Sequence, residues 1–550
     1  MFKCKQLLRR ICVVSYVFLL CGGLVNASNL VSKTNTLIGT QGNGWASGYL
    51  YPGATYPFGM VQFTPTYFTK QLGFVINQLS GAGCDHMGNF PTLPIAGALR
   101  VSPDSILNMQ TPVGKEIGTA GYYAATVDHS IRAELTVTER TGMARYTFSS
   151  KEKQGTVIIG GGVAATPIQV AAIKITGPHS CEGYAEGGAF CGIPTPYKVY
   201  FVAEFDADAE SFGTWKEERL HANHTFAEGS HSGVYFTFPL KEGNQAVQYK
   251  IGVSYVSVEN ARENLRVENP AWDFSAVRQA TQDKWNEYLG KIEVEGDNED
   301  RQMQFYTHLY RSLIHPNVCS DVNGEYMGAD SQVHKTARKF YTSFSNWDTY
   351  RTQTALIAML APEETSDIVM SHYLFAEQSG GGFPRWVLAN IETGVMQGDP
   401  TPILVANAYA FGARTYDPRT LLRTMRYGAE VPGANSQGVL TRPGLEQYLE
   451  KGYYDASILL EYTSSDFAIG RFALQACNDE PVCNWYTQRA MNWKNLFNKE
   501  TGWLQSRNED GSWKRYDADW RESTYKNYFW MVPYDLQGLI DSIGGKEAAE

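Results

Sequence analysis

The segment AWDFSAVRQATQDKWNEYLGK, residues 271–291, marks the point where the spacing of apolar residues along the chain changes. Its apolar side chains recur at the spacing of one helical face: Phe274, Val277, Trp285, Tyr288 and Leu289. Asp273 can cap the start of this helix and Gly290 its end. The pattern therefore predicts a linker region at residues 269–298, built around one helix.

Upstream of this helix, apolar residues alternate with polar or small ones, which is typical of β-strands. The stretch YKIGVSY, residues 249–255, alternates in this way, and alternating residues also flank Thr141-Gly142 on both sides, which predicts a hairpin there. Glycines are dense in this half, as many turns require. We therefore predict an N-terminal antiparallel β-sandwich over residues 28–268.

Downstream of residue 299 most segments carry the helical spacing. In MQFYTHLYRSLIHP the apolar residues Phe305, Leu309 and Leu313 are four apart, and a second apolar run follows Trp347 and stops at Pro362. A chain of 550 residues is too long for one hydrophobic core. The sequence thus predicts a second, all-α domain over residues 299–550, with function in the loops at one end of its helices.

The composition narrows the functional classes. A net charge of −10 argues against nucleic acid or an anionic membrane surface as a partner. Aromatic residues make up 13%, which fits either two large packed cores or a cleft that binds sugars through flat rings. The sequence has no Gly-Lys-Ser/Thr phosphate loop, no Gly-x-Ser-x-Gly elbow, and no Cys-x-x-Cys or His-x-x-x-His zinc pattern.

The N-terminus reads as an export signal. Basic residues at positions 3, 5, 9 and 10 precede an apolar stretch at 11–25, and Val25-Asn26-Ala27 is a small-residue cleavage site. No apolar run reaches the roughly 18 residues of a membrane span. We predict a signal peptide at residues 1–27 and an exported chain, periplasmic, on the cell surface or secreted, with Cys21 leaving a lipid-anchored alternative.

Six cysteines follow the signal region: Cys84, Cys181, Cys191, Cys319, Cys477 and Cys483. An exported chain can form disulfides. Cys181 with Cys191, and Cys477 with Cys483, are close enough in sequence to close small loops, although spacing alone leaves the connectivity open.

Three segments carry candidate functional residues. In SFSNWDTYRT, residues 343–352, Asp348 and Arg351 lie just inside a predicted helix start. They are either a capping carboxylate with a surface partner, or a carboxylate that grips sugar hydroxyls. The glycine-rich loop 78–94 adds Asp85 and His86, although a lone histidine is more often structural.

The second segment, GGGFPRWVLANIETGVMQGDP at residues 380–400, predicts a loop, a short helix and another loop. It offers four candidates: Arg385, Trp386, Glu392 and Asp399. Three consecutive glycines permit close backbone approach to another group, or form an ordinary tight turn.

The third segment, DADWRESTYKNYFWMVPYD at residues 517–535, places Glu522 among many aromatic residues. Aromatic surroundings would desolvate this carboxyl and raise its pKa, as a general acid near neutral pH requires. The alternative is a helix-surface glutamate whose carboxylate lies in solvent.

Eight motifs in order resemble the glycoside hydrolase family 92 α-mannosidases: PGATYPFGMVQFTP, LSGAGC, GYYAATVDHSIRAELTVTERTGMARYTF, FYTHLYRSLIHPNVCSDVNGEY, FSNWDTYR, FPRWVLANIETGVMQGDP, NWKNLFNKETGWLQSRNEDGSW and RESTYKNYFWMVPYDLQGLI. The resemblance implies a β-sandwich packed on a C-terminal (α/α)₆ barrel, with an active site at their interface. It implies calcium-dependent, exo-acting hydrolysis of terminal α-mannosides in glycans, with inversion. Glu522 matches the position of the catalytic acid and Asp348 that of a carboxylate contacting mannose. Further substrate-binding candidates follow from the matched motifs: Trp347, Arg351, Trp386 and Glu392.

The chain also departs from this family. It lacks the His-Asn-Glu-Pro-like and Gly-Asn-Asp-Asp-like segments, of which the second supplies the base and both serve calcium or sugar binding, so its metal ligands are unassigned. We therefore expect a barrel without its last helices and a fragment or truncated product. Ile391, Thr66 and Asn43 are smaller departures. Two alternatives remain: a sugar-binding protein or pseudoenzyme, and a sugar phosphorylase or other hydrolase of the same architecture.

Overall fold

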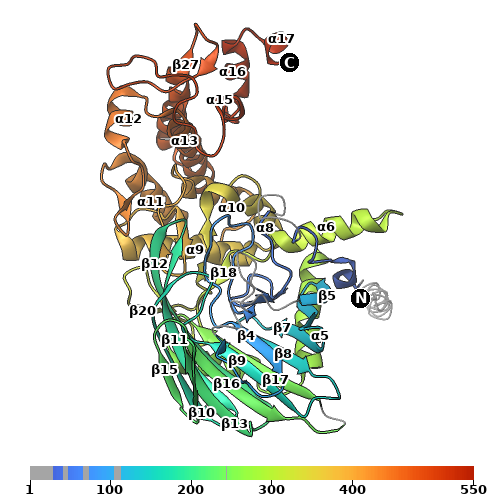
Figure 1. The fold of residues 1–550 in the computed structure, drawn as a ribbon. Coiled ribbons are helices and arrows are strands. Elements are labelled where there is room, and N and C mark those ends of the chain that lie inside the picture. The colour runs from blue at the N-terminus through green and yellow to red at the C-terminus, as the bar shows by residue number, and fades with distance from the viewer. Residues whose placement is uncertain (1–28, 41–47, 66–72, 104–112, 243–244) are drawn as a thin grey trace, which may run out of the picture.

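The computed structural model describes residues 29–40, 48–65, 73–103, 113–242 and 245–550. Figure 1 shows strands at one end of the molecule, the C-terminal helices at the other, and α8–α10 between them. The strands of the N-terminal part are β1 (Ala54–Thr55), β2 (Gln62–Pro65), β3 (Phe74–Val75), β4 (Thr92–Ala96), β5 (Val113–Thr119), β6 (Tyr122–Val127), β7 (Ile131–Val137), β8 (Thr141–Thr147), β9 (Gln154–Gly160), β10 (Ile168–Gly177), β11 (Ser180–Phe190), β12 (Ile193–Phe205), β13 (Ser211–Lys216), β14 (Arg219–Ala222), β15 (Phe226–Glu228), β16 (Ser232–Pro239) and β17 (Ala246–Ser254).

Within the described residues these strands form two antiparallel sheets. One has the order β1-β2-β3-β4-β9-β16-β13-β14, and the other β15-β10-β11-β12-β17-β8-β7-β6-β5. Strand residues from both sheets meet in one buried cluster, including Phe63, Ile158 and Phe236 from the first sheet and Tyr146, Phe201 and Tyr249 from the second. The predicted antiparallel β-sandwich is therefore confirmed.

The hairpin predicted around Thr141-Gly142 exists, but its turn lies earlier. β7 and β8 pair with Val137 opposite Gly142, so both Thr141 and Gly142 belong to the second strand. A Cβ on Gly142 would lie 2.9 Å from the Phe63 ring. Glycine at this position thus serves packing between the sheets rather than the turn, which explains why the sequence misplaced the turn.

Two helices follow the sandwich. α4 (Val258–Glu268) packs on β17, and α5 (Phe274–Leu289) is the predicted linker helix. The Asp273 side chain accepts a hydrogen bond from the Ala276 amide, and Gly290 follows the last turn, so both predicted ends are confirmed. The Trp285 indole donates to the Thr55 carbonyl at 2.7 Å and anchors this helix on the sandwich.

The remaining chain is mainly helical, as predicted. Its helices are α6 (Glu299–Ser312), α7 (Asn346–Thr349), α8 (Gln353–Leu360), α9 (Pro362–Ser379), α10 (Thr401–Ala410), α11 (Pro418–Glu430), α12 (Leu445–Lys451), α13 (Ala456–Cys477), α14 (Glu480–Ala490), α15 (Tyr525–Tyr528), α16 (Leu536–Ser542) and α17 (Lys546–Ala549), with a 3₁₀ turn at η2 (Met491–Leu496). Another 3₁₀ turn, η1 (Leu30–Lys33), precedes the sandwich. Short strand pairs connect them: β18 (Asn317–Val318) with β21 (Tyr341–Thr342), β19 (Glu325–Met327) with β20 (Val333–Lys335), β25 (Asn435–Ser436) with β26 (Val439–Leu440) and β27 (Phe497–Asn498) with β28 (Trp503–Leu504). Closure of the helices as an (α/α)₆ barrel stays a prediction.

The short helix predicted within residues 380–400 is wrong. β22 (Phe344–Ser345), β23 (Trp386–Leu388) and β24 (Ile391–Glu392) form a small three-stranded sheet instead. Of the three glycines before it, Gly380 caps the end of α9. Gly382 fits tightly against the chain, because a Cβ on it would lie 2.2 Å from the Thr441 hydroxyl oxygen. The close backbone approach that these glycines permit is therefore to other residues of this chain, such as Thr441.

Neither of the two pairings that sequence spacing allowed is present in the structure. Cys84 is bonded to Cys191, and Cys181, Cys319, Cys477 and Cys483 are free and buried. Cys181 and Cys191 stand at opposite ends of β11. Ten residues of extended strand separate them by roughly 33 Å, far beyond the reach of a disulfide.

Some predictions concern residues outside the described part of the chain: the signal peptide at 1–27, Asn43 and Thr66. Among the described residues, none of the helices combines the length and the apolar character needed to span a bilayer.

Candidate active site

A cavity of about 1010 Å³ lies between loops of the sandwich and the first half of the helical domain. The sandwich contributes Tyr49, the segment 79–84 and the Phe190–Cys191 turn. The helical domain contributes Asp348 and Trp386, among others, and Glu522 reaches the same cavity from far along the chain. Asp348 and Glu522 are the acidic side chains that line it among the described residues.

Strand pairing brings Asp348 and Trp386 together. Ser345 of β22 is directly opposite Trp386 of β23, and α7 begins at the next residue. The Ser345 hydroxyl donates to the Asp348 carboxylate. Partial desolvation raises the pKa of Asp348, although its carboxylate keeps access to solvent, and Ser345 and Arg351 oppose this rise by favouring the ionised form.

Trp386 forms a wall of the cavity. Its ring lies 4.2 Å from the Phe190 ring, at an interplanar angle of 33°. Phe190 precedes Cys191, whose disulfide to Cys84 joins the β11–β12 turn to the segment 79–84. The disulfide thus holds the two sandwich segments of the cavity together, and the Phe190–Trp386 pair packs them against the helical domain.

Glu392 lies behind this wall rather than on the cavity. Its carboxylate accepts from the backbone amides of Arg385 at 2.6 Å, Trp386 at 3.2 Å and Gly394 at 2.8 Å. Burial raises its pKa. The Glu392 carboxylate therefore holds the β23–β24 hairpin, and with it Trp386, in place. Glu392 itself does not line the cavity.

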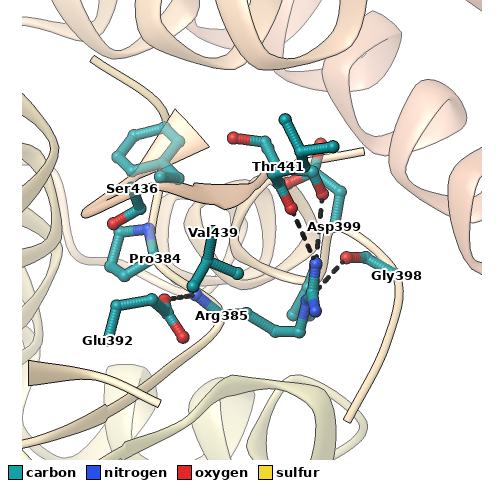
Figure 2. A pocket seen from close by; sticks show the side chains of 11 residues that line it. Pro384, Arg385, Glu392, Gly398, Asp399, Ser436, Val439 and Thr441 are labelled. Carbon is teal, nitrogen blue, oxygen red and sulfur yellow. Dashed lines mark hydrogen bonds between the residues drawn. The ribbon is translucent and has the colours of Figure 1, made fainter. Parts of the chain in front are cut away.

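Arg385 and Asp399 also serve internal contacts. Figure 2 shows Arg385 reaching toward Gly398 and Thr441 beside a small pocket of about 10 Å³. Its guanidinium donates to the carbonyls of Gly398 and Leu440, each at 3.0 Å. Asp399 pairs with the Arg442 guanidinium at 2.8 Å. Neither side chain lines the large cavity.

Trp347 and Arg351, predicted as substrate contacts, face away from the cavity toward helix α13. The Trp347 indole donates to the Glu461 carboxylate at 2.9 Å, and the Arg351 guanidinium pairs with it at 3.1 Å. Neither residue lines the cavity. The structure separates them from their neighbour Asp348, which points the other way.

Glu522 is exposed, so the expectation that aromatic residues bury its carboxyl is wrong. It precedes α15 in a bend with φ of 50°, a left-handed backbone that is uncommon for a residue with a side chain. The neighbouring rings of Tyr528 and Phe529 are buried in the helical core instead. Glu522 therefore borders open space at the cavity, and is on no helix surface.

The neighbouring loop candidates Asp85 and His86 lie in different environments. His86 is fully buried; its Nε2 accepts from the Leu79 amide at 2.7 Å and its Nδ1 donates to the Cys84 carbonyl at 2.7 Å. Burial lowers its pKa to about 4, so it is neutral and structural. Asp85 is exposed. Neither residue lines the cavity, although His86 shapes the segment that does.

Comparison with known families decides what the chain is. The model of the glycosyl hydrolase family 92 catalytic domain matches residues 260–550, more than half of the chain, and that of the family's N-terminal domain matches residues 34–254. This chain belongs to glycosyl hydrolase family 92. The resemblance inferred from the eight sequence motifs is confirmed, and membership makes the chain a glycoside hydrolase.

Two solved structures and one further protein are similar to this family 92 chain over most of its length. The family GH92 inverting mannosidase BT2199 from Bacteroides thetaiotaomicron superposes with a TM-score of 0.85 at 26% identity, over 94% of this chain and 73% of that one. The family GH92 alpha-mannosidase BT3965 from the same organism gives a TM-score of 0.86 at 24% identity, over 95% and 74% of the two chains. A protein of Arthroderma benhamiae described as an uncharacterized secreted glycosidase is 25% identical, over 94% of this chain and 72% of its own length.

Calcium, which the family resemblance implies, finds no ready site in the described residues. No group of three or more His, Cys, Asp or Glu side chains is arranged there to hold a metal ion. Calcium takes six to eight oxygen ligands, and the described carboxylates of this family 92 chain do not supply such a set by themselves.

Sequence reasoning missed two features of this family 92 site. One is the Cys84–Cys191 bond, which spacing could not reveal because the partners are 107 residues apart. The other is Glu461, which stands alone among apolar residues in ASILLEY, residues 456–462. A charged residue at an otherwise buried helical position was the signal that could have identified it.

Proposed function

We propose that this chain is an exo-acting α-mannosidase that hydrolyses terminal α-mannosides of glycans with inversion. The observation that carries the proposal is the cavity between sandwich and helices, which gathers Asp348, Glu522 and an aromatic wall in one space. A relative 26% identical to this chain is an inverting mannosidase, which supports both the sugar and the stereochemistry.

Glu522 is the proposed general acid. It would donate its proton to the oxygen of the departing glycan while the bond to the terminal mannose breaks. In the free protein Glu522 is exposed. A sugar that fills the cavity would exclude water from the carboxyl during the reaction.

Asp348 is the proposed sugar contact. An ionised carboxylate held by Ser345 at the cavity surface can accept hydrogen bonds from two sugar hydroxyls. Trp386 offers a flat apolar face beside it, which suits the C–H face of a pyranose ring. The two residues would fix the orientation of the terminal mannose relative to Glu522.

Calcium dependence is proposed from the family resemblance alone, and Asp348 and Glu522 are the acidic residues on the cavity among those described. A bound calcium ion would supply Lewis-acid contacts to sugar hydroxyls. No step above depends on it.

A second candidate function is sugar binding without turnover. Inversion requires one carboxylate as acid and another to activate water. If Asp348 is engaged by the sugar, Glu522 is left without a partner base among the described acidic residues of the cavity. Such a chain would bind mannose-containing glycans and release them unchanged.

One experiment separates the two functions. Mannose release from α-mannobiosides of each linkage is measured with calcium and with chelator, for the wild type and for Glu522→Gln. Turnover by the wild type that Glu522→Gln abolishes supports the α-mannosidase. Saturable binding by calorimetry with no mannose released supports the sugar-binding protein, and turnover retained by Glu522→Gln would refute the acid assignment.

We also propose that the protein is exported. The Cys84–Cys191 disulfide supports an oxidising compartment, as does the description of the Arthroderma benhamiae relative as secreted.

A further inference from the structure

One face of helix α13 contacts both chain segments that carry the cavity carboxylates. Glu461 is completely buried on this face, and its carboxylate accepts from Trp347 at 2.9 Å, Tyr350 at 2.8 Å and Arg351 at 3.1 Å. These three donors flank Asp348 on both sides in the chain. A single buried carboxylate thus fixes the segment that presents Asp348 to the cavity.

Ser457 lies one helical turn before Glu461, and therefore on the same face. Its hydroxyl lies 2.7 Å from the Asp519 carbonyl and 3.1 Å from the Gln397 side-chain oxygen. The Gln397 amide in turn donates to the Tyr528 hydroxyl at 3.1 Å. Asp519 and Tyr528 bracket Glu522, so the same helical face holds the second carboxylate's segment.

The two segments also touch one another directly. The Arg351 guanidinium contacts the Met531 sulfur at 3.6 Å, and its carbon lies 4.8 Å and 4.9 Å from the ring centroids of Trp347 and Tyr350. Close packing fixes Glu461 from behind, because a Cβ on Gly398 would lie 2.6 Å from the Glu461 Cβ. Glu461 has little freedom to move without moving its partners.

We propose that Glu461 is a positioning residue that sets the relative placement of Asp348 and Glu522 across the cavity. Its charge matters as well as its shape, because three donors converge on two carboxylate oxygens. A glutamine of the same size could turn its NH₂ group toward the Tyr350 hydroxyl, but it carries no charge, so the ion pair with Arg351 would be lost. The catalytic part of this inference rests on the proposed α-mannosidase activity; the structural part does not.

The structural part is tested by hydrogen exchange in the full chain, with two variants and a matched control. Glu461→Gln removes the charge, and Tyr350→Phe removes one donor to it. Tyr448→Phe is the control, since the Tyr448 hydroxyl donates at 2.6 Å to Asp466, another buried carboxylate of the same helix, whose partners Arg442 and Arg489 lie outside both segments.

We expect Glu461→Gln to lower amide protection about tenfold or more in residues 344–352 and 519–531, as loss of a hydrogen bond to a charged group implies. Tyr350→Phe should lower it several-fold in residues 344–352. Tyr448→Phe should leave both segments unchanged. Unchanged exchange in Glu461→Gln, or equal effects of Tyr350→Phe and Tyr448→Phe, would overturn the inference even if the protein has no mannosidase activity.

Kinetics test the catalytic part. Misplacement of a reacting group by about 1 Å costs on the order of 100-fold in rate, so Glu461→Gln should lower kcat on an α-mannobioside by that factor while KM changes little. Tyr448→Phe should keep wild-type kcat. Increased exchange with unchanged kcat would reduce Glu461 to a purely structural residue and refute the proposal. A wild type without turnover refutes the proposed function instead, while exchange still decides the structural link.

Discussion

The Cys84–Cys191 disulfide gives the sharpest test of the fold around the cavity. It closes a loop of 107 residues that begins in the segment 79–84 and ends at the β11–β12 turn. Closing a loop of this length removes conformational entropy from the unfolded chain worth about 4.7 kcal/mol at 25 °C. Replacing both cysteines by serine should therefore lower the free energy of unfolding of the sandwich by about 4–5 kcal/mol.

The assay is guanidinium unfolding of the wild type and of the double variant, each with and without reductant. Reductant should destabilise the wild type and leave the double variant unchanged, which controls for effects at the buried free cysteines. Thiol titration of a denatured, unreduced chain that begins at residue 28 should find the four thiols that the structure leaves free. Two thiols, or a peptide map that joins Cys181 to Cys191, would refute the assigned connectivity.

Three further predictions concern the walls of the cavity. Burial holds the pKa of His86 at about 4, below its value in the unfolded chain, so this group stabilises the fold above pH 6.5 and loses about 3 kcal/mol as pH falls to 4. His86→Gln should flatten that part of the pH dependence of unfolding, and an identical slope in both proteins would contradict the assignment. Glu392→Gln should lower the free energy of unfolding, measured by denaturation, by about 1–3 kcal/mol, because one of three backbone donors loses its acceptor. An unchanged free energy of unfolding would show that water takes over as the acceptor for that donor. Trp386→Ala should weaken mannose binding at least several-fold by calorimetry, whereas Trp485→Ala on α14, which is 45% exposed, should not, and equal affinities would remove Trp386 from the site.

The division into a β-half and an α-half could be predicted from the sequence because both signals are local. Alternation with period two and recurrence with period 3.6 each depend on residues close in the chain. The linker helix is the clearest example, since Asp273, Gly290 and the buried Trp285 were all identified from one segment. Where local signals conflict with packing, prediction failed, as for Gly142, whose missing side chain serves the Phe63 ring of the opposite sheet.

Local sequence patterns were enough to predict a β-half followed by an α-half, the family, and Asp348 and Glu522 as candidate site residues. Which side chains share a space could be read only from the folded chain, because this depends on contacts between residues far apart in the sequence. Folding placed Trp347 and Arg351 on buried Glu461, 110 or more residues away, and left Asp348 facing the cavity. In the folded chain Cys191 is bonded to Cys84 and not to Cys181, because the extended strand β11 keeps Cys181 and Cys191 far apart.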